Sequence, residues 1–526
     1  MLLQASTTEL FAVGDLRLIA PELILAVFAC VALVMEVVLP ARLSRVVGYF
    51  ALAGLALAAV SLALLGWPYL SAPFGDGFAP APLEGFYGTL RVDGFAVVFK
   101  LIFLLSAALA VALSFRYLDV EGEQRGEFYA LVLFATTGMM FLASGYDLIV
   151  LYISLELMAV TFYVLVAYAR RERRSNEAGL KYFLLGAFSS GVLLYGMSLL
   201  FGVGGSTNLG EIAPRLADAV LAPANTGEAT LRPLALLAMI AVAAGLFFKV
   251  AAAPFHMWAP DAYEGAPTPV TAFLSTGSKA ASFAFFARLF LDGLGGMRAD
   301  WAPLLGLVAA LTIFVGNWAA VTQTNAKRLL AYSSVSNAGY LLLGLVAANA
   351  YGYTGLAVYT LVYVFMNAGA FGVIISLRRR DIAGEDVESL NGLGRKSPAL
   401  ALAMAVFMLS LGGLPATGGF VGKWFLFGGL IERGAAEGRN WYYWLAGWAA
   451  LNTVVSFYYY VRFIRAMYIS ERPADSPPLA LSTPLKGALA VCAAAVVFIG
   501  VYPHPVIKLA EALVSSLGVG APLALR

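Results

Sequence analysis

The stretch that decides the fold is AAGLFFKVAAAPFHMWAPDAYEGAPTP, Ala243–Pro269, where an apolar run carries Lys249 and then meets Pro254. A second stretch, LGGLPATGGFVGKW at Leu411–Trp424, also joins a proline, glycines and a lysine, Lys423. Proline removes a helix hydrogen bond, and glycines loosen the same turn. Freed backbone groups at membrane depth are tolerated only beside protein or water. We therefore expect two broken helices in two repeated halves, each beside a polar site.

The composition indicates that the lipid bilayer is the solvent of this chain. Apolar residues make up 61% of the 526 and charged residues 12%, about half of the charged share in soluble domains. Apolar runs of about 18–25 residues recur almost end to end, and about 14 of them are long enough to span a bilayer. The sequence predicts an all-α polytopic membrane protein with about 14 transmembrane helices, of which helices 7 and 12 are broken.

The predicted helices divide the chain into four segments. Residues 1–126 hold helices 1–3, and residues 469–526 hold helix 14 and a tail. Between them, residues 127–292 with helices 4–8 and residues 293–468 with helices 9–13 are the expected repeats, each containing one broken helix.

Basic residues are unequally shared between the two sides of the expected bundle. Loops after odd-numbered helices hold about 19 Lys and Arg, including those at 170–174 and 378–380, whereas the opposite side holds about 9. The positive-inside rule places the richer side in the cytoplasm. Both termini are therefore expected outside the cytoplasm, which agrees with an even number of helices.

Four charged side chains lie deep inside apolar spans: Glu156, Lys249, Lys279 and Lys423. Each charge costs about 2.5–3.5 kcal/mol at mid-bilayer on insertion scales. A buried carboxyl or amine can exchange its proton when an opposite charge approaches or leaves, as a proton carrier requires. The default interpretation is an ion or proton path. The alternative is a set of ion pairs that only hold helices together.

Two further candidates are weaker. Lys181 lies about one turn inside helix 6, and its amine can also reach the surface by snorkelling. His256 directly follows the helix-7 break and is either a proton shuttle or a group that orders a loop beside Asp261 and Glu264.

Helix 10 adds polar groups that suit either a file of water molecules or close helix packing. The accessory candidates there are Tyr332, Ser333 and Asn337. Lys100 and Arg288 are expected to be snorkelling or helix-end residues, and Glu22 is expected at a solvated end of helix 1.

The residues exclude several kinds of chemistry. With two cysteines and two histidines, the chain lacks the usual ligand sets for iron–sulfur clusters, zinc or haem. It also lacks a Rossmann glycine pattern and a P-loop. We expect no cofactor in this chain, no nucleic-acid partner, and neither redox chemistry nor ATP hydrolysis.

Four long motifs resemble a known family, the antiporter-like membrane subunits of respiratory complex I, and among them the N type (mitochondrial subunit 2 type). The motifs are PFHMWAPDAYEGAPTPVTAF (254–273), STGSKAASFAFFARLF (275–290), KRLLAYSSVSNAGY (327–340) and SLGGLPATGGFVGKW (410–424). The resemblance covers about residues 127–465 and implies 14 helices, two inverted five-helix repeats and a central polar axis.

The resemblance also implies roles for residues. Five positions match the family's proton-transfer residues: Glu156, Lys181, Lys249, Lys279 and Lys423. Many relatives have a histidine where this chain has Asn337, and an amide cannot carry the proton itself. Any relay at that position is therefore expected to run through water or neighbouring hydroxyls.

The resemblance implies a proton-translocating subunit of NADH:quinone oxidoreductase in the bacterial inner membrane. NADH, FMN, iron–sulfur clusters and quinone would be bound by other subunits. The partners would be small helical subunits, a neighbouring antiporter-like subunit and the lipid bilayer. Three alternatives stay open: a subunit of a multisubunit cation/proton antiporter or membrane-bound hydrogenase, a structural scaffold, and, least favoured, a free-standing solute carrier.

Overall fold

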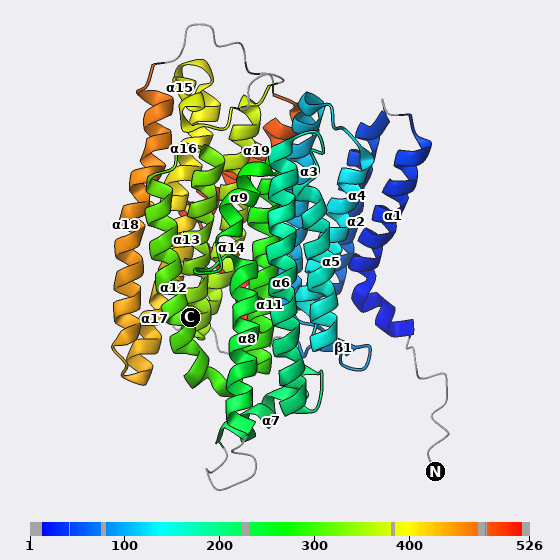
Figure 1. The fold of residues 1–526 in the computed structure, drawn as a ribbon, viewed down its shortest axis with the longest axis vertical. Helices are drawn as coiled ribbons and strands as arrows, with labels where there is room; N and C mark the ends of the chain where they lie inside the picture. Colours follow the sequence, from blue (N-terminus) through cyan, green and yellow to red (C-terminus); the bar gives the residue numbers. More distant parts are fainter. Residues whose placement is uncertain are drawn as a thin grey trace.

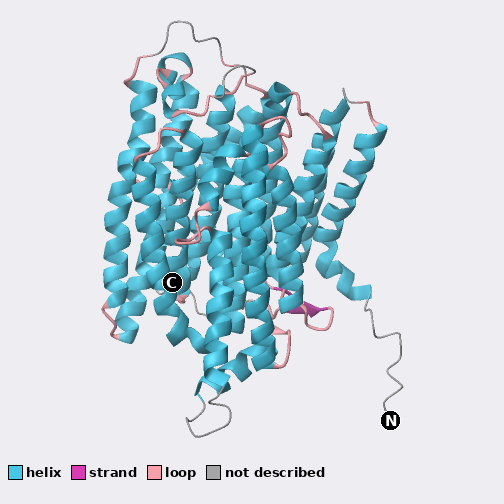
Figure 2. Ribbon diagram, viewed as in Figure 1, coloured by secondary structure: helices cyan, strands magenta, loops and turns pink. Residues whose placement is uncertain are grey.

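The structure is a computed structural model, and it describes residues 13–40, 43–74, 80–221, 231–379, 384–471, 479 and 481–517. Within these residues the chain forms a bundle of nearly parallel helices, with α1 and α2 at one edge and α18 at the other (Figure 1). A short antiparallel hairpin of strands β1 (Leu83–Gly85) and β2 (Leu90–Val92) lies at the lower edge of the bundle in Figure 2.

The long helices account for most of the described chain. Their bounds are α1 Ala20–Val38, α2 Ser44–Ser71, α3 Gly94–Glu121, α4 Gly126–Ser144, α5 Leu148–Val166, α6 Arg173–Gly204, α8 Arg232–Val250, α12 Arg298–Val321, α13 Ala326–Ala347, α14 Ala350–Leu377, α16 Pro398–Gly412, α17 Gly418–Glu437, α18 Trp441–Tyr468 and α19 Thr483–Val501. Shorter helices are α7 Leu209–Leu221, α9 Trp258–Gly265, α10 Thr268–Phe273, α11 Lys279–Ala287, α15 Leu393–Lys396 and α20 His504–Ser516.

The prediction of an all-α polytopic membrane protein is confirmed. Eleven helices of the described residues are long and apolar enough to cross a membrane. Three further expected spans do not meet that measure as single helices: the segment from α10 to Gly293, the pair α16 and α17, and α18. The count of 14 therefore stays a prediction.

The predicted break in helix 7 is present between α8 and α9. α8 ends at Val250, and Ala251 takes a left-handed conformation with φ of 58°. The turn frees backbone groups, which find side-chain partners nearby. The Ala253 N–H donates to Thr312 Oγ1 at 2.9 Å, and Trp258 Nε1 donates to the Phe248 carbonyl at 2.9 Å. The broken backbone is thus satisfied inside the protein.

The predicted break in helix 12 is present between α16 and α17. Gly413 ends α16 in the left-handed region, with φ of 83°. The N–H of Gly419, in the first turn of α17, donates to Ser410 Oγ at 3.0 Å. At this break too, a freed backbone N–H is satisfied by a side chain, here from α16.

Helix 8 contains a feature that the sequence did not predict. Between α10 and α11 the chain forms a π-helical segment, Leu274–Ser278, and a second one follows α11 at Arg288–Gly293. π segments are rare, and they occur frequently at functional sites. The first one ends immediately before Lys279.

The loops gather on two faces of the bundle. On the basic face, the Ala326 N–H bonds to the Glu385 carbonyl, and Arg378 pairs with Glu121 at 2.6 Å. Its described basic residues include Arg125, Arg170, Arg171, Arg173, Arg174, Arg378, Arg395 and Lys396. On the opposite hairpin face, the Tyr146 N–H bonds to the Thr89 carbonyl.

Two buried ion pairs correct the expectations for Glu22, Lys100 and Arg288. Glu22 and Lys100 are both 0% exposed in their side chains and lie 2.6 Å apart. Glu22 is buried because it lies three positions before Leu25, on the same buried face of α1. Arg288 is likewise buried and binds Asp93 through two hydrogen bonds of 2.6 and 2.8 Å.

We expect the change Lys100→Met to destabilise the protein by about 3–5 kcal/mol, because it leaves the Glu22 carboxylate buried without its partner. The double change Glu22→Gln with Lys100→Met should recover most of that loss. Arg45→Gln is the control, since Arg45 pairs with Asp119 at the surface and should cost at most about 1 kcal/mol. The midpoint of thermal unfolding in detergent measures all three. A double variant as unstable as Lys100→Met would contradict the assignment.

Candidate functional site

Five lysines are buried among the described residues, and they fall into two groups. Lys100 pairs with Glu22 at 2.6 Å, and Lys327 pairs with Glu385 at 3.2 Å. The other three are Lys249, Lys279 and Lys423, which are 5%, 3% and 3% exposed. Each of these three amines binds a neutral oxygen, and none forms an ion pair with a described carboxylate. We call these three the unpaired lysines.

Lys249 lies in the last turn of α8, next to the helix-7 break. Its Nζ donates to Ser190 Oγ of α6 at 3.0 Å and lies 6.0 Å from the centroid of the Tyr163 ring of α5. The break therefore places the amine where α5, α6 and α8 meet. A protonated Lys249 has a hydroxyl and an aromatic face as polar neighbours.

Glu156 of α5 is the carboxylate that interacts electrostatically with Lys249. The two are not within ion-pair distance. Glu156 is half-buried, and its Oε1 is shielded from solvent without a hydrogen-bond partner among the described residues. Glu156 and Lys249 therefore form no ion pair in this structure, and Glu156 Oε1 is free to accept a hydrogen bond.

Lys279 starts α11 directly after the π segment. Its Nζ donates to the backbone carbonyl of Ser334 in α13. Small polar groups of the π segment also bond to neighbouring helices, Thr276 to Ser106 at 2.6 Å and Ser275 to Asn367 at 2.6 Å. The π segment therefore places Lys279 against α13 and is itself held by α3 and α14.

Lys423 lies in α17, just after the helix-12 break. Its Nζ donates to the Leu411 carbonyl at 3.0 Å and lies 4.5 Å from the centroid of the Tyr340 ring. A Cβ on Gly413 would lie 3.1 Å from Lys423 Cδ. Gly413 therefore serves two requirements, the left-handed turn and the space for the lysine.

The accessory residues of α13 separate into two environments. Tyr332 is half-buried beside Arg328, whose guanidinium lies 6.0 Å from its ring centroid. Ser333 and Asn337 point inward, and Asn337 Nδ2 donates to Ser333 Oγ at 3.3 Å. Only the latter two therefore join the buried region that contains the unpaired lysines.

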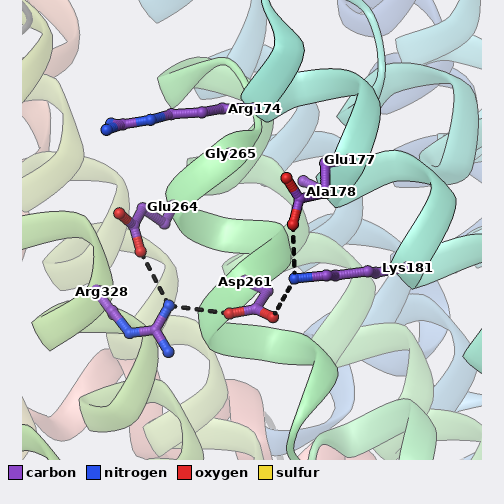
Figure 3. Close-up of a pocket in the computed structure, with 8 residues that line it drawn as sticks. All are labelled: Arg174, Glu177, Ala178, Lys181, Asp261, Glu264, Gly265 and Arg328. Carbon is purple, nitrogen blue, oxygen red and sulfur yellow. Dashed lines mark hydrogen bonds and ion pairs between the residues drawn. The ribbon is translucent and has the colours of Figure 1, made fainter.

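Lys181 differs from the unpaired lysines because it is exposed on the basic face. Figure 3 shows Lys181 and Arg328 reaching Asp261 from opposite sides. Lys181 pairs with Asp261 at 3.1 Å and with Glu177 at 2.9 Å, and Arg328 pairs with Asp261 and Glu264 at 2.9 Å each. These groups line an open cavity of about 260 Å³, whose charges largely neutralise one another.

Asp261 and Glu264, which follow His256 along the chain, bind Lys181 and Arg328. A proton shuttle and a loop-ordering group both stay predictions for His256. His256 is half-buried, and its Nδ1 has no hydrogen-bond partner among the described residues.

Sequence reasoning missed the tyrosines that surround the inner face of α13. Ser333 Oγ lies 2.5 Å from the Tyr460 hydroxyl of α18, and the Tyr359 hydroxyl of α14 donates to Asn337 Oδ1 at 2.6 Å. Tyrosines are common in membrane spans, so composition alone could not single these out. In the described part of the chain, no group of three or more His, Cys, Asp or Glu side chains could hold a metal ion.

The fold and the unpaired lysines define a class of polytopic membrane proteins that place ionisable groups beside broken helices. A family model described as NADH:quinone oxidoreductase/Mrp antiporter, TM matches residues 145–440. The chain belongs to this family.

Relatives and a solved structure agree with that membership. The chain is 52% identical over 429 residues to NADH-quinone oxidoreductase subunit N 2 of Solibacter usitatus, covering 82% of this chain and 84% of that one. It is 47% identical over 511 residues to subunit N 1 of Koribacter versatilis, covering 96% of each. A chain of respiratory complex I from Thermus thermophilus with bound aureothin superimposes with a TM-score of 0.75 at 36% identity, covering 93% of this chain and 98% of that chain.

Proposed function

We propose that this chain is a proton-translocating membrane subunit of NADH:quinone oxidoreductase, complex I. Its similarity to chains named subunit N extends over nearly the whole sequence. The structure that it resembles at 36% identity is a complex I assembly, in which such a chain lies among other membrane subunits. The resemblance of the four motifs agrees with both comparisons.

The observation that carries the proposal is that Lys249, Lys279 and Lys423 form no ion pair with a carboxylate of the described residues. A buried ammonium without a counter-charge is costly, and a structural lysine is normally paired, as Lys100 and Lys327 are. An amine that is not held in an ion pair can gain and lose a proton without breaking one. This distribution argues against the scaffold alternative, in which the lysines only hold helices together.

In the proposed route, protons enter through the first half of the chain, pass Lys279 and leave near Lys423. Glu156 and Lys249 form the exchanging pair of the first half, which the separated arrangement and the open Oε1 of Glu156 support. Lys181 serves at the basic face, where it lines an open cavity together with its ion-pair partners Asp261 and Glu177.

The energy comes from quinone reduction elsewhere in the complex. We assign the binding of NADH, FMN, iron–sulfur clusters and quinone to other subunits. The partners of this chain within the bilayer are small helical subunits and a neighbouring antiporter-like subunit. The chain acts as one part of this enzyme by moving protons, not by exchanging electrons.

We place the chain in a bacterial inner membrane with its basic face toward the cytoplasm. The described chain begins and ends on the hairpin face, because Asp15 accepts from the Phe86 N–H and Ser516 accepts from the Phe95 N–H. This supports periplasmic termini, although residues 1–12 and 518–526 themselves lie outside the described residues. We also propose 127–292 and 293–468 as the two inverted repeats, between segments 1–126 and 469–526.

A second candidate is a subunit of a multisubunit cation/proton antiporter, because the family model covers Mrp antiporters as well. A subunit of a membrane-bound hydrogenase is the other form of this candidate. Mass spectrometry of the chains that copurify with this one distinguishes them. Copurified NADH- and quinone-binding subunits support our proposal, and cation-antiporter or hydrogenase subunits would replace it.

We expect Glu156→Gln and Lys249→Met each to lower NADH-driven proton translocation by the assembled complex about tenfold or more, because a positioned proton-transfer group contributes about 10²–10⁴-fold. Lys486→Met, at an exposed position of α19, is the control and should translocate protons normally. Proton uptake by inverted membrane vesicles measures the effect, with the amount of assembled complex checked on native gels. Full stoichiometry of pumping in both site variants would remove the proposal.

We expect Gly413→Ala to lower proton translocation about tenfold or more, because small displacements of a reacting group cost up to about 10²-fold. The new methyl group presses on Lys423 Cδ. Gly438→Ala is the matched control, since Gly438 has φ of 64° and no atom lies within 4 Å of the place that its methyl group would take.

Gly413→Ala and Gly438→Ala each put an alanine in a left-handed turn, which costs about 1–2 kcal/mol. The thermal stability of the two variants should therefore fall by similar amounts. Equal proton translocation in the two variants would show that displacement of Lys423 has no effect.

A further inference from the structure

We propose that the hydroxyls of Tyr460 and Tyr359, together with that of Ser333 and positioned by Asn337, form the bridge that carries a proton between Lys279 and Lys423. This inference rests on the proposed function and assigns two residues to it.

The distance that the bridge has to cover is set by α13. Lys279 binds the carbonyl of Ser334, and Lys423 lies over the ring of Tyr340. These two contacts lie six positions apart on the same helix, which corresponds to about 9 Å along its axis. That length exceeds a single hydrogen bond, so intermediate groups are needed for transfer.

A connected set of polar side chains occupies this interval. Tyr460 Oη and Ser333 Oγ are 2.5 Å apart, Asn337 Nδ2 donates to Ser333 Oγ at 3.3 Å, and Tyr359 Oη donates to Asn337 Oδ1 at 2.6 Å. Three helices, α13, α14 and α18, thus bring their polar groups to one place.

Two members of this set, Ser333 and Tyr359, adjoin residues that bind or precede the lysines. Ser333 is the chain neighbour of Ser334, whose carbonyl binds Lys279. At the other end, the Tyr359 ring packs against Gly422, where a Cβ would come within 2.6 Å of it. Gly422 directly precedes Lys423, so the ring of Tyr359 lies beside the backbone that carries the second amine.

The set is sealed from bulk solvent. Tyr359 is 0% exposed, and Tyr460, Ser333 and Asn337 are each 1% exposed. Buried polar groups are normally retained only when they bond to one another or to enclosed water. A proton that leaves Lys279 toward Lys423 therefore meets these groups rather than bulk water.

The chemistry divides the four residues into two roles. A hydroxyl oxygen can accept one proton and release its own, so Tyr460, Ser333 and Tyr359 can relay. An amide donates through its nitrogen and accepts through its oxygen, so Asn337 cannot pass a proton on. Asn337 is a positioning residue that holds the Tyr359 and Ser333 hydroxyls in fixed orientations.

The transfer moves one proton and conserves atoms and charge. The Lys279 ammonium loses one proton and becomes an amine, each hydroxyl on the way accepts a proton and releases another, and the Lys423 amine becomes an ammonium. Enclosed water molecules complete the links to the two lysines and around the Asn337 amide. No net charge stays on the bridge after the transfer.

The test compares tyrosine-to-phenylalanine variants in the assembled complex. Tyr359→Phe and Tyr460→Phe should each lower NADH-driven proton translocation about tenfold or more, as expected for removal of a proton-transfer group. The double variant should be no worse than the poorer single one, because both act on one route. Proton uptake by inverted vesicles is measured together with the amount of assembled complex.

Tyr69→Phe is the matched control. Tyr69 lies on α2, is 3% exposed, and donates to the Ala81 carbonyl at 2.8 Å. Its loss removes a buried tyrosine hydroxyl and a hydrogen bond outside the bridge. It should leave translocation within about twofold of the unaltered complex. An equal loss in Tyr69→Phe would show a merely structural role for these tyrosines and overturn the inference.

Two further variants separate this inference from the proposed function. If Lys279→Met and Lys423→Met stop translocation while both tyrosine variants keep it, the bridge is wrong and the proposed function stands. If the two lysine variants translocate normally, the proposed function itself is wrong. Should Tyr460→Phe reduce assembly, Ser333→Ala removes the same hydrogen bond from the other side, and normal translocation in that variant would overturn the bridge.

Discussion

Every polar group buried in the bilayer needs a partner inside the protein, and this constraint shapes both broken helices. At the helix-7 break, Thr312 accepts from the freed Ala253 N–H. At the helix-12 break, the freed Leu411 carbonyl accepts from Lys423 itself. The freed carbonyl of the second break is therefore bound by an amine whose protonation state can change. An ammonium offers three donors and a neutral amine two, so the protonation of Lys423 bears directly on how this turn is held.

The breaks and the mid-span charges could be predicted because both are local properties of the sequence. Proline and clustered glycines interrupt a helix wherever they occur, and a lysine in the middle of an apolar run is buried whichever helix it faces. The position of Glu22 was also readable, since it lies on the stripe of α1 with Leu25 and Ala29, yet its proximity to a helix end suggested solvent. Depth within a bundle depends on the neighbours as well as on the distance from a helix end.

The remaining features could not be predicted because they arise where distant segments meet. The π segment at Leu274–Ser278 has no proline and no unusual glycine content to mark it, and its side chains are held by α3 and α14. The tyrosines around Asn337 come from two other helices. For Lys181, the resemblance indicated a role, but its ion pairs with Asp261 and Glu177 at the surface became apparent only in three dimensions.

The buried lysines show how one chain treats the same charge in two ways. A carboxylate beside Lys100 or Lys327 stabilises a permanent ammonium, and removing it would leave an uncompensated charge. A carboxylate at that distance from Lys279 would hold the proton and oppose its onward transfer. Hydroxyls, carbonyls and aromatic faces solvate the ammonium less strongly, so they lower the cost of burial without fixing the proton in place. Under the proposed function, the choice of neutral partners at the unpaired lysines would be what distinguishes a route for protons from a set of ion pairs that hold helices together.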